Sequence, residues 1–133
     1  MPSVLIVDDE PLARQRIRLL LRDEPGLEIV GEAGSGADAL AVIARAAPDL
    51  VFLDVQMPEM DGYETARRVT ERWAAAPAAR PRMIAMTGNA MQGDRERCLE
   101  AGMDDYISKP VRVEELRAML ERWGAPQPTG AAR

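Results

Sequence analysis

Histidine is absent from this sequence, and two other reactive residue types occur only once. The 133-residue chain has a single cysteine, Cys98, and a single lysine, Lys109, among 17 basic residues. Without histidine the chain has no Ser-His or Cys-His nucleophile pair, no histidine metal ligand and no phosphohistidine of its own. One cysteine cannot close an internal disulfide, and Cys98 lies in a helical pattern typical of a small buried group.

Long apolar runs and excess positive charge are also missing. No segment approaches the roughly 20 apolar residues of a membrane helix, and the N-terminus has no signal-peptide pattern. We therefore expect a cytoplasmic protein without a membrane partner. The net charge of −5 argues against a nucleic-acid-binding surface. The remaining composition, 47% hydrophobic and 29% charged, is ordinary for one globular domain. We expect that domain over 1–123 and a disordered tail or linker stump over 124–133.

Five mostly apolar runs alternate with five amphipathic segments along the chain. The runs have the length of buried strands and end at polar residues or turn signals; they are Val4–Val7, Leu27–Ala33, Leu50–Leu53, Met83–Met86 and Asp104–Ser108. The segments between and after them predict helices at about 10–22, 36–47, 63–73, 90–101 and 111–123. We expect Arg14, Arg18 and Arg22 on the outer side of the first helix. The expected core face of the last helix is Val113, Leu116, Leu120 and Trp123.

This alternation predicts an α/β fold, an open, doubly wound parallel sheet with helices on both faces. Right-handed crossovers and the strand order 2-1-3-4-5 would place the first and third strands at the switch point of the sheet. The acids that follow these strands, Asp8, Asp9 and Asp54, should then converge. Thr87 and Lys109, which follow the fourth and fifth strands, should flank them.

Three neighbouring acids at a sheet edge need a cation. Two carboxylates about 4 Å apart repel by roughly 4 kcal/mol at an effective dielectric near 20. Mg²⁺ suits such oxygen ligands, because it binds one or two carboxylates, keeps waters and reaches a phosphate oxygen. Asp54 could then attack a phosphoryl group without a general base, with Lys109 and Thr87 as donors to the transferred charge. Taken alone, Asp54 is more often a strand-end turn cap, and Thr87 is as often a helix cap.

Together these residues resemble the receiver domain of two-component response regulators. The resemblance covers about Ser3 to Trp123 and depends on five short motifs in order: Asp8-Asp9, Asp54 with Met57-Pro58 and Asp61-Gly62, Thr87, Asp105-Tyr106, and Lys109-Pro110. It implies the flavodoxin-like (βα)5 three-layer sandwich. It also implies a phosphorelay switch that catalyses only its own phosphorylation and dephosphorylation.

The resemblance further implies a role for each motif residue. Asp54 would accept phosphate from the phosphohistidine of a sensor kinase or histidine phosphotransfer protein. Asp9, Asp8, Asp54 and the backbone carbonyl of Gln56 would hold Mg²⁺. Lys109 would pair with the phosphoryl group, Thr87 would bond to it, and Tyr106 would swing inward behind Thr87. The signal would leave through the face formed by 90–123, to an unknown output partner, a detached effector domain or a second copy of this chain.

The two halves of the sequence resemble different receivers. The first half is similar to receivers of DNA-binding regulators and the second half to receivers of hybrid sensor kinases. A natural or engineered mosaic would have its seam between about Tyr63 and Met86.

Two other classes of function fit the same fold. One is a docking module that does not use phosphate. The other is an enzyme or electron carrier on the same sheet. A flavodoxin-like carrier would need a phosphate-cradling loop, whereas the loop here is Asp8-Asp9-Glu10; an aspartate phosphatase would need an acid where Gln56 stands.

Overall fold

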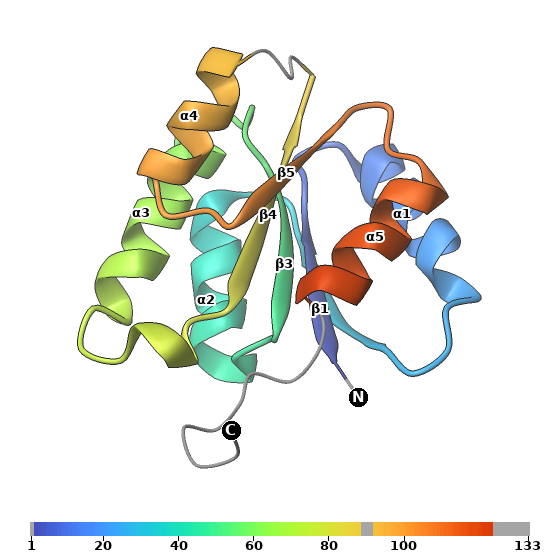
Figure 1. The fold of residues 1–133 in the computed structure, drawn as a ribbon, viewed down its shortest axis with the longest axis horizontal. Coiled ribbons are helices and arrows are strands. Elements are labelled where there is room, and N and C mark those ends of the chain that lie inside the picture. Colours follow the sequence, from blue (N-terminus) through green and yellow to red (C-terminus); the bar gives the residue numbers. More distant parts are fainter. Residues whose placement is uncertain (1, 89–91, 124–133) are drawn as a thin grey trace.

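A parallel sheet of five strands forms the middle layer of the structure, and helices cover both of its faces (Figure 1). This computed structural model describes residues 2–88 and 92–123. The strands are β1 (Ser3–Val7), β2 (Glu28–Ala33), β3 (Leu50–Asp54), β4 (Arg82–Thr87) and β5 (Asp105–Ser108). The helices are α1 (Pro11–Arg22), α2 (Gly36–Ala46), α3 (Gly62–Arg72), α4 (Gln92–Glu100) and α5 (Val113–Trp123), with a 3-10 turn, η1, at Pro77–Ala79.

The strand order is β2-β1-β3-β4-β5 and every pairing is parallel, which confirms the predicted fold. The tail expected over 124–133 and the expected helix start at Ala90 lie outside the described residues. The division into a 1–123 domain and a tail therefore stays a prediction. In the part of the chain that the structure describes, no helix is both long and apolar enough to cross a membrane.

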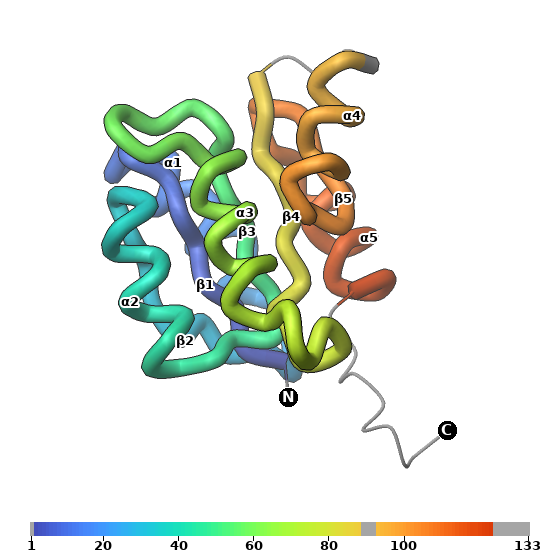
Figure 2. The backbone as a smooth tube through the Cα atoms, turned by 90° about the vertical axis from the view of Figure 1, so that its left-hand side faces the viewer, coloured from blue at the N-terminus to red at the C-terminus, as the bar shows by residue number. Residues whose placement is uncertain are grey.

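Each face of the sheet has its own hydrophobic core. Leu5 and Leu53 pack with residues of α2, α3 and α4 on one face, and these three helices lie next to one another in Figure 2. Ile6 and Phe52 pack with residues of α1 and α5 on the other face. Because both faces are covered, β1 and β3 are buried along nearly their whole length. Polar groups needed for function are therefore confined to the strand ends.

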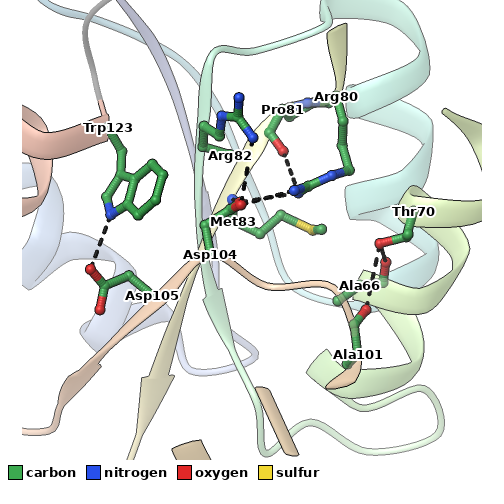
Figure 3. A network of polar contacts seen from close by, with 10 residues as sticks. All are labelled: Ala66, Thr70, Arg80, Pro81, Arg82, Met83, Ala101, Asp104, Asp105 and Trp123. Carbon is green, nitrogen blue, oxygen red and sulfur yellow. Dashed lines mark hydrogen bonds and ion pairs between the residues drawn. The ribbon is translucent and has the colours of Figure 1, made fainter. Parts of the chain in front are cut away.

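The core face of α5 contains three of the expected residues, Leu116, Leu120 and Trp123, and adds Met119. Leu116 is buried as predicted, but Met119 is the other buried residue of this helix, while Val113, Leu120 and Trp123 are only partly buried. Leu120 and Trp123 pack against the core on the face of the sheet that α5 shares with α1 (Figure 1). The Trp123 indole N–H also donates to Asp105 at 3.0 Å, as Figure 3 shows.

A cluster of ion pairs closes the amino ends of β4 and β5 (Figure 3). Asp104 accepts two hydrogen bonds from Arg80, at 2.8 and 3.0 Å, and one from the backbone amide of Met83 at 2.8 Å. Arg82 lies 3.6 Å from the same carboxylate. The Asp104 side chain is only 10% exposed. This cluster ties the Ala- and Pro-rich connection after α3 to the sheet. The composition of that connection does not predict such an anchor.

We expect Asp104→Ala to lower the free energy of unfolding by about 2–4 kcal/mol, because it leaves two largely buried arginines without their shared carboxylate. Glu64→Ala is the matched control. Glu64 also pairs with two arginines, Arg67 and Arg68, but at the surface, so its loss should lower the free energy of unfolding clearly less than the loss of Asp104 does. Urea unfolding followed by circular dichroism measures both, and equal losses in the two variants would contradict the anchoring role of Asp104.

Candidate functional site

Three acids meet at the carboxyl end of the sheet. The pairing of Val7 with Leu53 aligns the ends of β1 and β3, so Asp8 and Asp54 emerge next to each other. Asp8, Asp9 and Asp54 each place a carboxylate oxygen within 4.8 Å of the other two. Asp8 and Asp54 are buried, whereas Asp9 reaches solvent. This is the convergence that the strand order predicts.

Lys109 reaches the same acids from the end of β5. Its Nζ lies 3.0 Å from Asp8 Oδ2 and 3.3 Å from Asp54 Oδ1. The backbone amide of Lys109 also donates to the Thr87 carbonyl at 2.8 Å, which fixes the root of the side chain against β4. The structure thus brings the one lysine of the sequence into contact with two of the three acids.

Asp8 and Asp54 are also held by their own loops. The Glu10 amide donates to Asp8 Oδ1, and the Gln56 amide donates to Asp54 Oδ1, each at 3.0 Å. These are ordinary strand-end turns in which an aspartate accepts a bond from two residues ahead. Asp8 and Asp54 therefore cap their own turns and also belong to the acidic cluster. The Gln56 carbonyl remains only a predicted metal ligand.

Electrostatics at this edge oppose the charge of Asp54. Burial raises the pKa of Asp54 from 3.8 to about 6; the negative charge of Asp8 adds to the rise, while the Gln56 amide and Lys109 act in the opposite direction. Burial acts to lower the pKa of Lys109, but its hydrogen bond to Asp8 and the charge of Asp54 outweigh burial and raise it. At neutral pH the Asp54 carboxylate is therefore mostly ionised while the Lys109 ammonium keeps its charge.

The donor set fits a magnesium ion. An octahedral Mg²⁺ with oxygens at about 2.0–2.1 Å places adjacent ligands about 2.9 Å apart and opposite ligands about 4.1 Å apart. Carboxylate oxygens that already lie within 4.8 Å of one another need only a small movement to meet this requirement. Lys109 offsets only part of the charge of three carboxylates, so a second cation would relieve the remaining repulsion.

Thr87 and Tyr106 occupy the neighbouring strand ends. Thr87 is buried at the end of β4, and its hydroxyl donates to Asp94 in the first turn of α4 at 3.3 Å. Tyr106 is partly buried on β5, with the Arg95 guanidinium 6.0 Å from its ring centre. The sequence reasoning missed Asp94, whose only signal was an acid one helical turn after the expected start of its helix.

A groove of about 550 Å³ opens beside these residues. Gln56, Asp61, Thr87 and Asp94 line it, together with Arg97, which stacks 4.1 Å from the centre of the Tyr63 ring. The loop after β3 and the start of α4 both line this groove, which is open to solvent next to the acids.

The structure corrects the expected position of Arg14. Helical periodicity predicts it on the outer side of its helix, yet its side chain is only 20% exposed. Its Nη1 donates to the Asp8 carbonyl at 2.7 Å, and its Nε donates to Glu32 at 3.2 Å. Helical periodicity places the Cα of a residue on a face, but a long side chain can turn back over the strand ends.

Residues 4–121 match the family model of the response regulator receiver domain. A hybrid signal transduction histidine kinase of Dictyostelium discoideum is 40% identical over 92% of this chain. The transcriptional regulatory protein BtsR of Salmonella typhi is 36% identical, also over 92% of this chain. The chain spans 7% of the length of the first relative and 48% of the second. Both kinds of relative match nearly the whole chain, so these matches locate no seam, and the mosaic stays a prediction.

Two solved structures have the same fold. The receiver domain of a sensor histidine kinase from Pseudomonas aeruginosa, solved with magnesium in its active-site cleft, superposes with a TM-score of 0.79 at 35% identity and covers 94% of this chain and 98% of that one. The receiver domain of a Saccharomyces cerevisiae response regulator, solved with the histidine phosphotransfer protein Ypd1, has a TM-score of 0.83 at 26% identity, over 92% of this chain and 90% of that one.

The raised pKa of Asp54 predicts that this acid destabilises the metal-free fold. Between pH 3.8 and about 6 the folded state binds the Asp54 proton more tightly than the unfolded chain does, so stability falls as the pH rises through this window. At pH 7 without metal, Asp54→Asn should raise the free energy of unfolding by about 1–3 kcal/mol. Near pH 3.8 this gain should be lost.

Denaturant unfolding in the presence of a chelator measures this difference across the pH range. Asp23→Asn is the control, because the Asp23 side chain is 84% exposed and lies at the carboxyl end of α1. An Asp54→Asn protein that is less stable than the wild type at pH 7 would contradict the raised pKa of Asp54.

Proposed function

Because this chain belongs to the response regulator receiver domain family, we propose that it is a phosphorylation-activated switch with Asp54 as the phosphoacceptor. Receiver domains of two-component systems take a phosphoryl group from histidine kinases or phosphotransfer proteins. The observation that carries the proposal for this chain is a buried aspartate at the end of β3 that faces two further acids and the only lysine.

The attacking oxygen would come from Asp54. The contacts of its carboxylate with Gln56 and Lys109 are both to Oδ1, so Oδ2 would attack. Oδ2 forms the new P–O bond as the P–N bond of the donor phosphohistidine breaks, and the imidazole nitrogen leaves with the bonding pair. Asp54 is mostly ionised at pH 7 because its pKa is about 6, so no general base is required.

The neighbouring residues supply the charge that the transfer needs. Asp8, Asp9 and Asp54, with the Gln56 carbonyl, would hold Mg²⁺, which when bound offsets negative charge on the phosphoryl oxygens. Lys109 keeps an ammonium donor within 3.3 Å of the acceptor carboxylate, in position for a phosphoryl oxygen.

The switch would work through Thr87. An aspartyl phosphate adds about −1.5 to −2 charge and three acceptor oxygens. Thr87 would exchange its 3.3 Å bond to Asp94 for a bond to the phosphoryl group, and Tyr106 would move into the space behind it. Since Asp94 belongs to α4, this exchange would release the start of that helix and carry the signal to the face formed by α4, β5 and α5. The donor would be a sensor kinase or a histidine phosphotransfer protein, and the receiver of the signal an output partner or a separate effector domain.

Incubation with Mg²⁺ and a small phosphodonor should add one phosphoryl group to the wild type. Intact-mass spectrometry detects the addition, which should disappear in Asp54→Asn and after chelation of the metal. Lys109→Arg should fold but transfer slowly, because a guanidinium cannot replace the compact ammonium. A wild type that gains no phosphoryl group, or gains it equally in Asp54→Asn, would leave a phosphate-independent docking module as the better account.

Phosphorylation-dependent dimerisation through the α4–β5–α5 face is a second expected outcome. This face carries charges of both signs, including Arg95, Glu115 and Arg122, so a second copy can offer complementary charges. Light scattering with and without a phosphate mimic should show the mass doubling in the wild type and no change in Asp54→Asn. An unchanged wild-type mass would reject the dimer while leaving the phosphoacceptor intact.

A further inference from the structure

Arg14 links the acidic edge to the neighbouring strand β2. Its Nη1 donates to the backbone carbonyl of Asp8 at 2.7 Å while its Nε donates to Glu32 Oε1 at 3.2 Å. Glu32 is itself only 23% exposed, and its other oxygen pairs with Arg18, whose side chain is 53% exposed. Glu32 therefore holds the Arg14 guanidinium in the orientation that reaches Asp8.

Gly34 leaves room for this guanidinium. A Cβ at Gly34 would lie 3.2 Å from Arg14 Nη1, closer than an ordinary contact. The end of β2 thus contributes both an acid that orients Arg14 and a residue without a side chain where Arg14 passes.

The carbonyl that Arg14 binds belongs to the peptide unit between Asp8 and Asp9. Because a peptide unit is planar and rigid, a bond that fixes its oxygen also fixes the nitrogen and Cα of Asp9. Asp8 has other anchors, since its amide donates to the Ala33 carbonyl and its carboxylate accepts from Lys109. Asp9 is the most exposed of the three acids, so burial constrains its position least.

We propose that Arg14 is a positioning residue for the cation site. By holding the Asp8–Asp9 peptide, it keeps the Asp9 carboxylate beside those of Asp8 and Asp54. The inference rests on the proposed function in one respect, namely that these three acids bind Mg²⁺.

Charge and position predict opposite effects when Arg14 is removed. If Arg14 acted only as a positive charge near the acids, its loss would strengthen the binding of a divalent cation. If it positions Asp9, its loss should weaken Mg²⁺ binding by about tenfold, as loss of a group that orients a metal ligand commonly does. The sign of the change therefore separates the two roles.

Isothermal titration calorimetry of the full chain with magnesium chloride provides the test. Arg14→Met should bind Mg²⁺ about tenfold more weakly than the wild type, and Arg14→Lys should show a smaller loss, since an ammonium keeps the charge but not the two-armed geometry. Arg18→Met is the matched control, because it breaks a pair with the same Glu32 but does not touch Asp8; its affinity should stay within about twofold of the wild type. Thermal unfolding of each variant identifies any that fail to fold, and Arg14→Lys then decides the question in place of Arg14→Met.

The outcomes separate this inference from the proposed function. A wild type that binds no Mg²⁺ would overturn both. A wild type that binds Mg²⁺ and is phosphorylated, with Arg14→Met or Arg14→Lys binding the ion as tightly or more tightly, would overturn the positioning role alone.

Discussion

The repulsion between carboxylates at one buried sheet edge is the constraint on which the site depends. Asp8 and Asp54 are nearly without solvent, and Asp9 stands beside them. At such distances each pair of like charges costs several kcal/mol unless a cation intervenes. Lys109 supplies one positive charge, and a second cation would relieve the repulsion that remains. Burial is the main reason that the pKa of Asp54 is raised rather than lowered, and the negative charge of Asp8 adds to the rise. Under the proposed function, a divalent cation would relieve the remaining negative charge.

The two ends of the sheet use charge in opposite ways. At the amino ends of β4 and β5, Asp104 pairs with Arg80 and Arg82 in a largely buried cluster. At the carboxyl ends, acids outnumber their partner. The Asp104 cluster and the candidate functional site therefore lie at opposite ends of the strands of one sheet.

Much of this arrangement follows from the sequence, because topology alone brings strand ends together. The order of five parallel strands was enough to place Asp8, Asp9, Asp54 and Lys109 at one edge, as the structure has them. The direction of individual side chains could not be predicted from the sequence. Arg14 turns back over the end of β1 instead of pointing to solvent, and Asp94 takes the Thr87 hydroxyl, because both contacts depend on rotamers and helix placement rather than on periodicity. The burial of Met119 beside the expected residues Leu116, Leu120 and Trp123 has the same origin, since the position of α5 beside α1 decides which side of the helix is covered.

A crystal structure of the protein grown with magnesium would test the central claim most directly. The account predicts one Mg²⁺ bound between carboxylate oxygens of Asp8, Asp9 and Asp54, with the Lys109 ammonium still within hydrogen-bonding distance of the Asp54 carboxylate. An ion bound elsewhere on the protein, with Asp9 and Lys109 turned away from Asp54, would contradict it.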